Sequence, residues 1–145
     1  MKPLEAWLAE YAESHRNPVN RWIHKICVPA IFFSLVGLLS LVRWSPFSSS
    51  PFASAAVLVG AATLAFYYSL GRAPFLKMLV LEALALLFFS WLEPRLPFAG
   101  WWYAGIFVVA WIGQFVGHEV EGKKPSFFED LQFLLIGPLW VFRFG

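Results

Sequence analysis

Three long stretches of the chain contain no charged residue. They cover residues 26–42, 44–71 and 96–118. A helix needs about 20 predominantly apolar residues, within a range of roughly 17 to 25, to cross the hydrocarbon core of a membrane. Each stretch is near or above that length, so the pattern predicts helices that span a membrane.

For helices of this length, the sequence predicts four spans joined by short loops rich in Pro and Ser. The expected spans are residues 26–43, 53–70, 75–92 and 99–117. Continuous apolar runs of this length suit helices, because a helix satisfies its own backbone hydrogen bonds in lipid. Short loops favour antiparallel neighbours. We therefore predict an all-α fold, an integral membrane antiparallel four-helix bundle that forms a single domain over residues 1–145.

The third expected span is the least uniform, because Lys77 and Glu82 lie in it. An acidic residue inside a membrane is often functional. Glu82 lies only about 8 Å from Lys77 along a helix that rises roughly 1.5 Å per residue. We expect a structural or supporting role for Glu82, paired with a cation such as Lys77 or Arg72.

Shorter segments flank the spans at both ends of the chain. Leu4, Trp7, Leu8 and Tyr11 recur at i, i+3, i+4 and i+7, which is typical of an amphipathic helix. At the other end, residues 131–142 are apolar but only twelve residues long, which favours an interfacial or re-entrant segment over a fifth crossing.

Composition agrees with a membrane protein. Hydrophobic residues make up 59% of the chain and charged residues 14%, whereas an average soluble domain is roughly 25% charged. The net charge of +2 gives no electrostatic support for nucleic-acid binding. Cys27 is the only cysteine, so the chain cannot form an intramolecular disulfide, and a packed apolar role suits it better than that of a nucleophile.

The distribution of Lys and Arg predicts an orientation. If both termini lie on one side of the membrane, nine of the eleven basic residues lie there, and only Arg43 and Arg95 lie on the other side. The excess of positive charge in cytoplasmic loops then places both termini in the cytoplasm. All three histidines fall on the same side.

These histidines are the candidate chemistry of the chain. His24 lies at the entrance to the first span and His118 at the exit of the fourth, so an antiparallel bundle brings them to one depth. His15 precedes them, before an Asn17-Pro18 pair that predicts a helix start with Asn17 as the N-cap. Glu121 follows His118 by about one helical turn, as a fourth ligand or as a group that orients an imidazole. Three imidazoles with an optional carboxylate suit Fe(II) or Zn(II).

A simpler interpretation of the same residues stays open. Glu119 and Glu121 could be solvated at a polar helix end, with Lys123 and Lys124 against anionic lipid headgroups. Residue spacing alone does not choose between this interpretation and a metal site.

Two separated motifs resemble a known family. The first runs from Tyr11 to His24 and is followed by Pro29, and the second runs from Gly117 to Pro125 and is followed by Gly137-Pro138-Leu139. Both resemble the 2-hydroxy fatty acid dioxygenase family of small membrane proteins, long catalogued as a domain of unknown function. It includes the enzyme of the α-oxidation step in phytosphingosine breakdown. The resemblance covers nearly the whole chain, with the motifs in the right order and hydrophobic spans between them.

The resemblance implies an Fe(II)-dependent dioxygenase that shortens a 2-hydroxy fatty acid by one carbon with O2 and releases CO2. It implies catalytic iron ligands at His15, His24 and His118. For this chemistry we expect two kinds of supporting residue. Candidates to orient the ligands are Asn17, Asn20 and Glu121, and candidates to neutralise the substrate carboxylate are Lys124 and Arg21.

Other classes of function stay open at this stage. His24 and His118 could bind a haem between them, or the chain could be a non-catalytic lipid-binding protein. The expected partners are a 2-hydroxy fatty acid, O2 and membrane lipid, with a homo-oligomer left open and no nucleic acid. We expect an integral membrane location, in a bacterial inner membrane by preference and in the endoplasmic reticulum for a eukaryotic chain.

Overall fold

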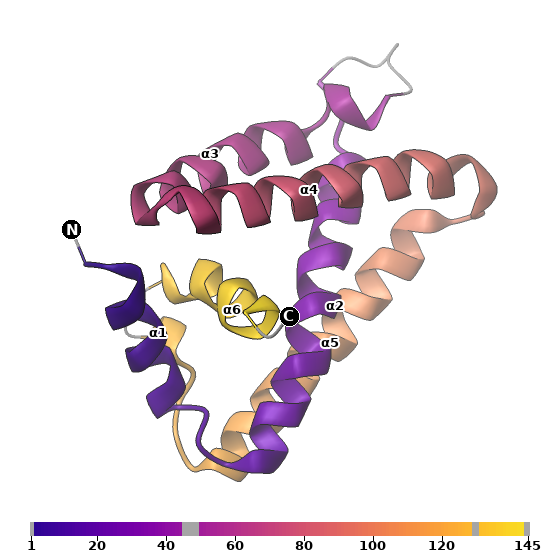
Figure 1. The fold of residues 1–145 in the computed structure, drawn as a ribbon. Coiled ribbons are helices and arrows are strands. Elements are labelled where there is room, and N and C mark those ends of the chain that lie inside the picture. Colours follow the sequence, from indigo (N-terminus) through magenta and orange to yellow (C-terminus); the bar gives the residue numbers. More distant parts are fainter. Residues whose placement is uncertain (1, 45–49, 129–130, 144–145) are drawn as a thin grey trace. The chain divides into compact units, whose positions relative to one another are not determined.

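The computed structural model describes residues 2–44, 50–128 and 131–143, and their regular structure is helical apart from one isolated bridge between Arg43 and Ser54. The described part of the chain contains six α-helices (Figure 1). They are α1 (Leu4–Glu13), α2 (Pro18–Ser40), α3 (Ala55–Leu70), α4 (Arg72–Leu92), α5 (Ala99–Glu121) and α6 (Phe133–Phe142). The all-helical prediction is confirmed.

Three helical segments are long and apolar enough to cross a membrane: Pro18–Ser40, Arg72–Arg95 and Ala99–Glu121. They correspond to the first, third and fourth expected spans. The second expected span is also helical, but α3 has only 16 residues and is about 24 Å long at roughly 1.5 Å per residue. Large apolar side chains are exposed on all three long segments, including Ile26, Leu84 and Val109. Exposed apolar side chains of this kind suit contact with lipid, whereas a four-span bundle stays a prediction.

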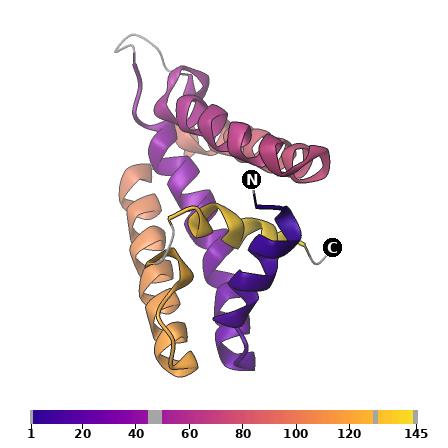
Figure 2. The ribbon, with the colours of Figure 1, turned by 90° about the vertical axis from the view of Figure 1, so that its left-hand side faces the viewer.

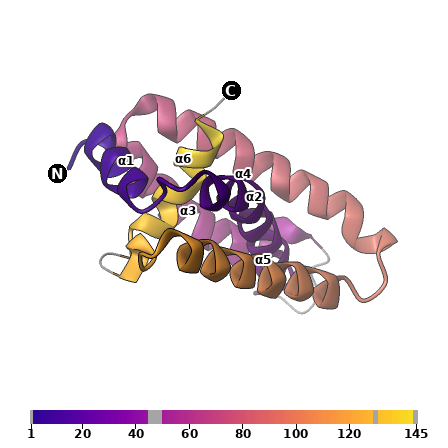
Figure 3. The same cartoon turned by 90° about the horizontal axis from the view of Figure 1, so that it is seen from below.

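The chain divides into two compact units. One contains the residues up to Phe32 and from Val108 onward, and the other is Phe33–Phe107. In the first unit, α1 packs on α6, as the views in Figures 2 and 3 show. The Trp7 and Phe133 rings meet edge to face with their centroids 5.1 Å apart. Trp7, Leu8 and Tyr11 are buried on one face of α1, which confirms the amphipathic helix.

Glycines set how closely the start of α2 packs against the end of α5. A Cβ on Gly113 would lie 2.6 Å from Cys27 Sγ, and a Cβ on Gly117 would overlap the Asn20 side chain. A side chain at either position would therefore push the helices apart. The two contacts run in opposite order along the chain, so these parts of α2 and α5 are antiparallel.

In the second unit, α3 and α4 form a helical hairpin, and Gly71 between them has a φ of +137° that suits glycine. Glu82 on α4 is hydrogen-bonded across this hairpin, because Thr63 Oγ1 donates to Glu82 Oε1 at 2.8 Å. The structure thus gives Glu82 a hydroxyl of α3 as partner, rather than the expected ion pair with Lys77 or Arg72. A structural role for Glu82 stays a prediction.

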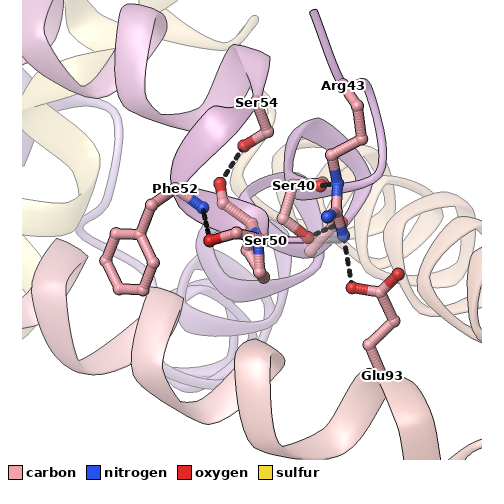
Figure 4. A network of polar contacts seen from close by, with 8 residues as sticks. Ser40, Arg43, Ser50, Phe52, Ser54 and Glu93 are labelled. Atoms are coloured by element: carbon pink, nitrogen blue, oxygen red, sulfur yellow. Dashed lines mark hydrogen bonds and ion pairs between the residues drawn. The ribbon is translucent and has the colours of Figure 1, made fainter. Parts of the chain in front are cut away.

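Polar contacts stabilise the segments around the N-terminus of α3 (Figure 4). Arg43 pairs with Glu93, with 2.5 Å between Nη2 and Oε2, and Arg43 Nε donates to the Ser40 carbonyl at 2.6 Å. Ser54 Oγ donates to the carbonyl of Pro51. The backbone N–H groups of Trp44 and Ala55 donate to the carbonyls of Ala53 at 3.2 Å and Val42 at 2.8 Å, and these two bonds connect the residues on either side of the segment 45–49.

The second unit also has an apolar core, which yields a stability prediction. Its buried residues are Ala85, Phe89, Ala99 and Tyr103. A Cβ on Gly37 would lie 3.0 Å from both the Phe89 and the Tyr103 ring. Gly37→Ala should therefore lower the free energy of unfolding by about 1–3 kcal/mol, the usual cost of overpacking. Thermal unfolding in detergent measures the change.

Gly105→Ala is the matched control for Gly37→Ala. A Cβ on Gly105 meets no atom within 4 Å, and alanine is the better helix former by about 1 kcal/mol. The control should unfold at the same temperature as the unchanged protein or at a higher one. Equal losses of stability in both variants would contradict the packing explanation.

Candidate metal centre

Three histidines from three segments meet in the first unit. His15 lies between α1 and α2, His24 lies on α2, and His118 lies near the end of α5. Their side chains can each offer one nitrogen such that all three nitrogens lie within 4.8 Å of one another. The imidazole centroids are 4.2, 5.0 and 4.8 Å apart for the pairs 15–24, 15–118 and 24–118. The expected gathering of the three histidines is present in the structure.

The sequence between α1 and α2 brings His15 back over His24. Asn17 caps α2 as predicted, because its Oδ1 accepts from Val19 N at 2.9 Å and its carbonyl accepts from Arg21 N at 3.0 Å. Pro18 suits the first helical position, where a missing N–H costs nothing. The chain therefore ends α1, turns and restarts within a few residues. This tight turn places His15 next to a side chain nine positions later.

Backbone carbonyls fix the orientation of two of the rings. Nδ1 of His15 donates to the Tyr11 carbonyl at 2.6 Å, and Nδ1 of His24 donates to the Asn20 carbonyl at 3.0 Å. Because a carbonyl can only accept, the proton of each neutral ring lies on Nδ1. Each Nε2 then keeps a free lone pair. Hydrogen bonds of this kind also hold the rings of known metal-ligating histidines.

The buried nitrogens of the cluster fit a metal ion. Nε2 of His15 and Nδ1 of His118 are buried and have no hydrogen-bond partner among the described residues. A buried nitrogen without a partner is costly, so such atoms call for an explanation. Three neutral imidazoles are a common donor set for Zn(II) and for Fe(II).

Burial keeps His15 in the protonation state that metal binding needs. Its side chain is only 2% exposed, and this burial lowers the pKa of His15 to about 4. The ring is therefore neutral at pH 7. Only a neutral imidazole has a lone pair to give to a metal.

Glu121 connects the end of α5 to the start of α2. Its two carboxylate oxygens accept from the backbone N–H of Asn17 at 2.9 and 3.1 Å, and Asn20 Nδ2 donates to Oε1 at 3.0 Å. Asn20 Nδ2 also donates to the Ser14 carbonyl at 3.1 Å. The helix of His118 extends to Glu121, as expected. Among the described residues, the side chains close enough to share one ion are the three histidines.

Arg21 and Lys124, the two basic residues expected to neutralise a substrate carboxylate, differ in their positions. Arg21 is exposed, and its guanidinium lies 5.9 Å from the centroid of the Trp140 ring. The Trp140 ring is in turn 5.2 Å from the His15 ring. Lys124 is exposed in the turn after α5, next to Lys123, whose Nζ donates to the Glu13 carbonyl at 3.5 Å. Arg21 therefore lies at the edge of the cluster, whereas no described contact brings Lys124 to it.

Two aromatic residues that sequence reasoning did not connect with the site pack against His15. The Tyr11 ring stacks on the His15 ring with centroids 4.1 Å apart and planes 13° from parallel. Trp140 of α6 packs on Tyr11 at 5.4 Å. The four-residue spacing from Tyr11 to His15 was a usable signal. No comparable signal in the sequence indicated the approach of α6. That approach depends on Gly137, where a Cβ would lie 3.0 Å from Tyr11 Oη.

We expect Glu121→Ala to loosen the site. The change removes the acceptor of Asn17 N and one acceptor of Asn20, so it should cost about 1–2 kcal/mol of unfolding free energy, since the carboxylate is partly exposed. Glu119→Ala is the control, because Glu119 is exposed on the same helix. Thermal unfolding of both variants measures the difference. Equal stability of the two would contradict the role given to Glu121.

Comparisons with known proteins agree with the motifs and with the cluster. The family model described as 2-hydroxy-palmitic acid dioxygenase Mpo1-like matches residues 1–144. The chain is also 33% identical over 140 residues to the 2-hydroxy-palmitic acid dioxygenase MPO1 of Saccharomyces cerevisiae, covering 95% of this chain and 76% of that protein. No solved structure matches. The resemblance noted in the sequence is confirmed, and the chain belongs to the 2-hydroxy-palmitic acid dioxygenase Mpo1-like family.

Proposed function

We propose that this chain is an Fe(II)-dependent dioxygenase that converts a 2-hydroxy fatty acid into the fatty acid one carbon shorter. The observation that carries the proposal is the cluster of three buried histidines in a chain of this family. In the overall reaction, the 2-hydroxy acid and one O2 give the shortened acid, one CO2 and one water. The substrate supplies all four electrons that reduce O2, so no other reductant is needed.

His15, His24 and His118 would hold the iron. When bound, the iron would supply O2 activation and an electrophilic site for the carboxylate and hydroxyl of the substrate. The protein keeps the His15 and His24 rings in place through the carbonyls of Tyr11 and Asn20. Glu121, Asn17 and Asn20 orient the histidines by fixing the end of α5 on the start of α2.

The remaining residues of the site would bind the substrate. Arg21 lies at the exposed edge of the cluster and suits a carboxylate, since its guanidinium can form two hydrogen bonds with one. Lys124 is the weaker candidate, because it lies in an exposed turn. The acyl chain would pass along the apolar side chains of α2 and α5, which continue into lipid.

A haem between His24 and His118 does not suit this geometry. A porphyrin must lie between its two axial imidazoles. The centroids of these two rings are only 4.8 Å apart, and the His15 ring lies 4.2 Å from one and 5.0 Å from the other. The space is taken by imidazoles, which favours a single ion.

The iron proposal predicts that each histidine is needed. In protein purified without oxygen and reconstituted with Fe(II), we expect about one iron per chain and oxygen uptake on addition of 2-hydroxypalmitate. His15→Ala, His24→Ala and His118→Ala should each lose most of the iron and at least about 100-fold of the activity, since each removes one ligand. Elemental analysis and an oxygen electrode measure the two effects.

Two controls accompany the histidine variants. Cys27→Ala removes a thiol that lies on the same face of α2 as His24, and this variant should keep both iron and activity. Circular dichroism identifies any variant that fails to fold, and the conservative His→Gln variants then replace it. Full activity in a folded histidine variant, or a protein that binds no metal and consumes no oxygen, would reject the proposal in favour of a non-catalytic lipid-binding protein.

We also propose that α2, α3, α4 and α5 all cross the membrane, with both termini in the cytoplasm. Nine of the eleven Lys and Arg residues then lie on the cytoplasmic side. Four crossings place the chain before α2 and the chain after α5 on one side. Three crossings, with α3 outside the hydrocarbon core, would place them on opposite sides.

Single cysteines introduced into Cys27→Ala protein separate these two topologies. We chose Lys2, Phe98 and Phe128 for replacement, because they lie outside the three candidate spans. With four spans, an impermeant thiol reagent on the cytoplasmic side should label Lys2→Cys and Phe128→Cys but not Phe98→Cys. Labelling of Lys2→Cys and Phe128→Cys from opposite sides would show that α3 does not cross.

A further inference from the structure

Gln114 is a buried polar residue for which the histidine cluster gives no role. Its side chain is 8% exposed and its Oε1 is buried. The described residues offer that oxygen no hydrogen-bond partner. Buried amides in folded proteins are nearly always hydrogen-bonded, so an exception inside an apolar helix points to a partner outside the chain.

The position of Gln114 on α5 directs it toward the cluster. Gln114 precedes His118 by four residues, and residues at this spacing lie on one face of a helix. It lies about 6 Å from His118 along the helix axis, at roughly 1.5 Å per residue. The direction is toward the interior of the apolar span and away from the polar end at Glu121.

The packing of α2 on α5 places His24 opposite Gln114. Asn20 lies against Gly117, and Cys27 lies against Gly113. His24 lies between Asn20 and Cys27 on the same face of α2. It therefore faces α5 between Gly113 and Gly117, where Gln114 lies. This register places Gln114 level with His24 along the helices, and the His118 ring lies 4.8 Å from the His24 ring.

The chemistry of an unpartnered amide oxygen limits its ligand. Such an oxygen can only accept, so its partner must be a donor. Under the function proposed above, on which this inference rests, the substrate has two polar groups. Its carboxylate cannot donate, whereas its 2-hydroxyl can. Arg21 at the exposed edge suits the carboxylate, and the hydroxyl on the next carbon would then lie deeper, toward Gln114.

We propose that Gln114 Oε1 accepts a hydrogen bond from the 2-hydroxyl group of the substrate and so selects 2-hydroxy fatty acids over unsubstituted ones. A site built around a hydrogen bond to a hydroxyl discriminates strongly against an analogue without that group, because the polar atom of the site then stays unpaired. Gln114 is therefore a specificity residue in contact with the substrate.

Gln114→Met tests the proposal, since methionine keeps the length and shape of the side chain but lacks the amide oxygen. Binding of 2-hydroxypalmitate and of palmitate is measured on the full-length, metal-free protein, so that chelation by iron does not contribute to the preference. The unchanged protein should bind the 2-hydroxy acid more tightly. In Gln114→Met this preference should fall by about 10-fold, the effect of one hydrogen bond, with palmitate binding unchanged.

Stability and iron content distinguish a substrate-binding role of Gln114 from a structural role and from a role as a metal ligand. Gln114→Met should unfold at the same temperature as the unchanged protein or at a higher one, because no partner within the protein is lost. Its iron content after reconstitution should also be unchanged. Phe115→Leu, a change at an exposed neighbour on α5, is the control and should keep the preference.

Three results would overturn the proposal. They are an unchanged preference in Gln114→Met, a loss of iron from that variant, which would make Gln114 a ligand, and a loss of stability, which would make it structural. A different set of results would show that the dioxygenase proposal alone is wrong. In that case the metal-free protein still prefers the 2-hydroxy acid and the preference still depends on Gln114, but the iron-loaded protein consumes no oxygen.

Discussion

The site depends on the carboxylate of Glu121. By accepting hydrogen bonds from Asn17 and Asn20, it joins the last turn of α5 to the first turn of α2. His118 lies three residues before Glu121, and His24 lies four residues after Asn20, so this contact lies about one helical turn from each of these two rings. Asn20 also holds the Ser14 carbonyl, which connects the segment of His15 to the same point. Glu121 is not among the side chains close enough to share one ion, and we propose that its carboxylate holds the histidines in place.

The histidine cluster leaves polar atoms buried without a hydrogen-bond partner among the described residues. In the second unit, Glu82 accepts a hydrogen bond from Thr63 and Arg43 forms an ion pair with Glu93, whereas the Tyr103 hydroxyl is buried without a partner in the part of the chain that the structure describes. In the cluster, Nε2 of His15 and Nδ1 of His118 are buried without a partner among the described residues. Groups that are costly to bury and positioned by specific hydrogen bonds are typical of a site prepared for a ligand. The family to which the chain belongs gives an independent reason to expect one.

Close helix packing is the second requirement of the site. Gly113 and Gly117 let α2 approach α5 closely, and Gly137 lets α6 approach Tyr11. Small residues matter in this way in a membrane protein, because lipid is as apolar as the helices and association depends on tight packing. The packing of Trp140 on Tyr11 follows from the approach of α6, and the Tyr11 ring in turn stacks on the His15 ring. The glycines therefore support the histidine cluster although none of them belongs to it.

The sequence by itself determined which segments are helical, where α2 begins, and which imidazoles are available. Long uncharged runs predict helices, the Asn17-Pro18 pair predicts a helix start, and only three histidines are present. The tertiary structure decided which side chains meet. It gave Glu82 the partner Thr63 and packed Trp140 of α6 against Tyr11 and His15. Periodicity could not reveal these contacts, because a helix in lipid is apolar on nearly every face. The facing residues are then set by the packing of glycines and by a few hydrogen bonds between distant segments.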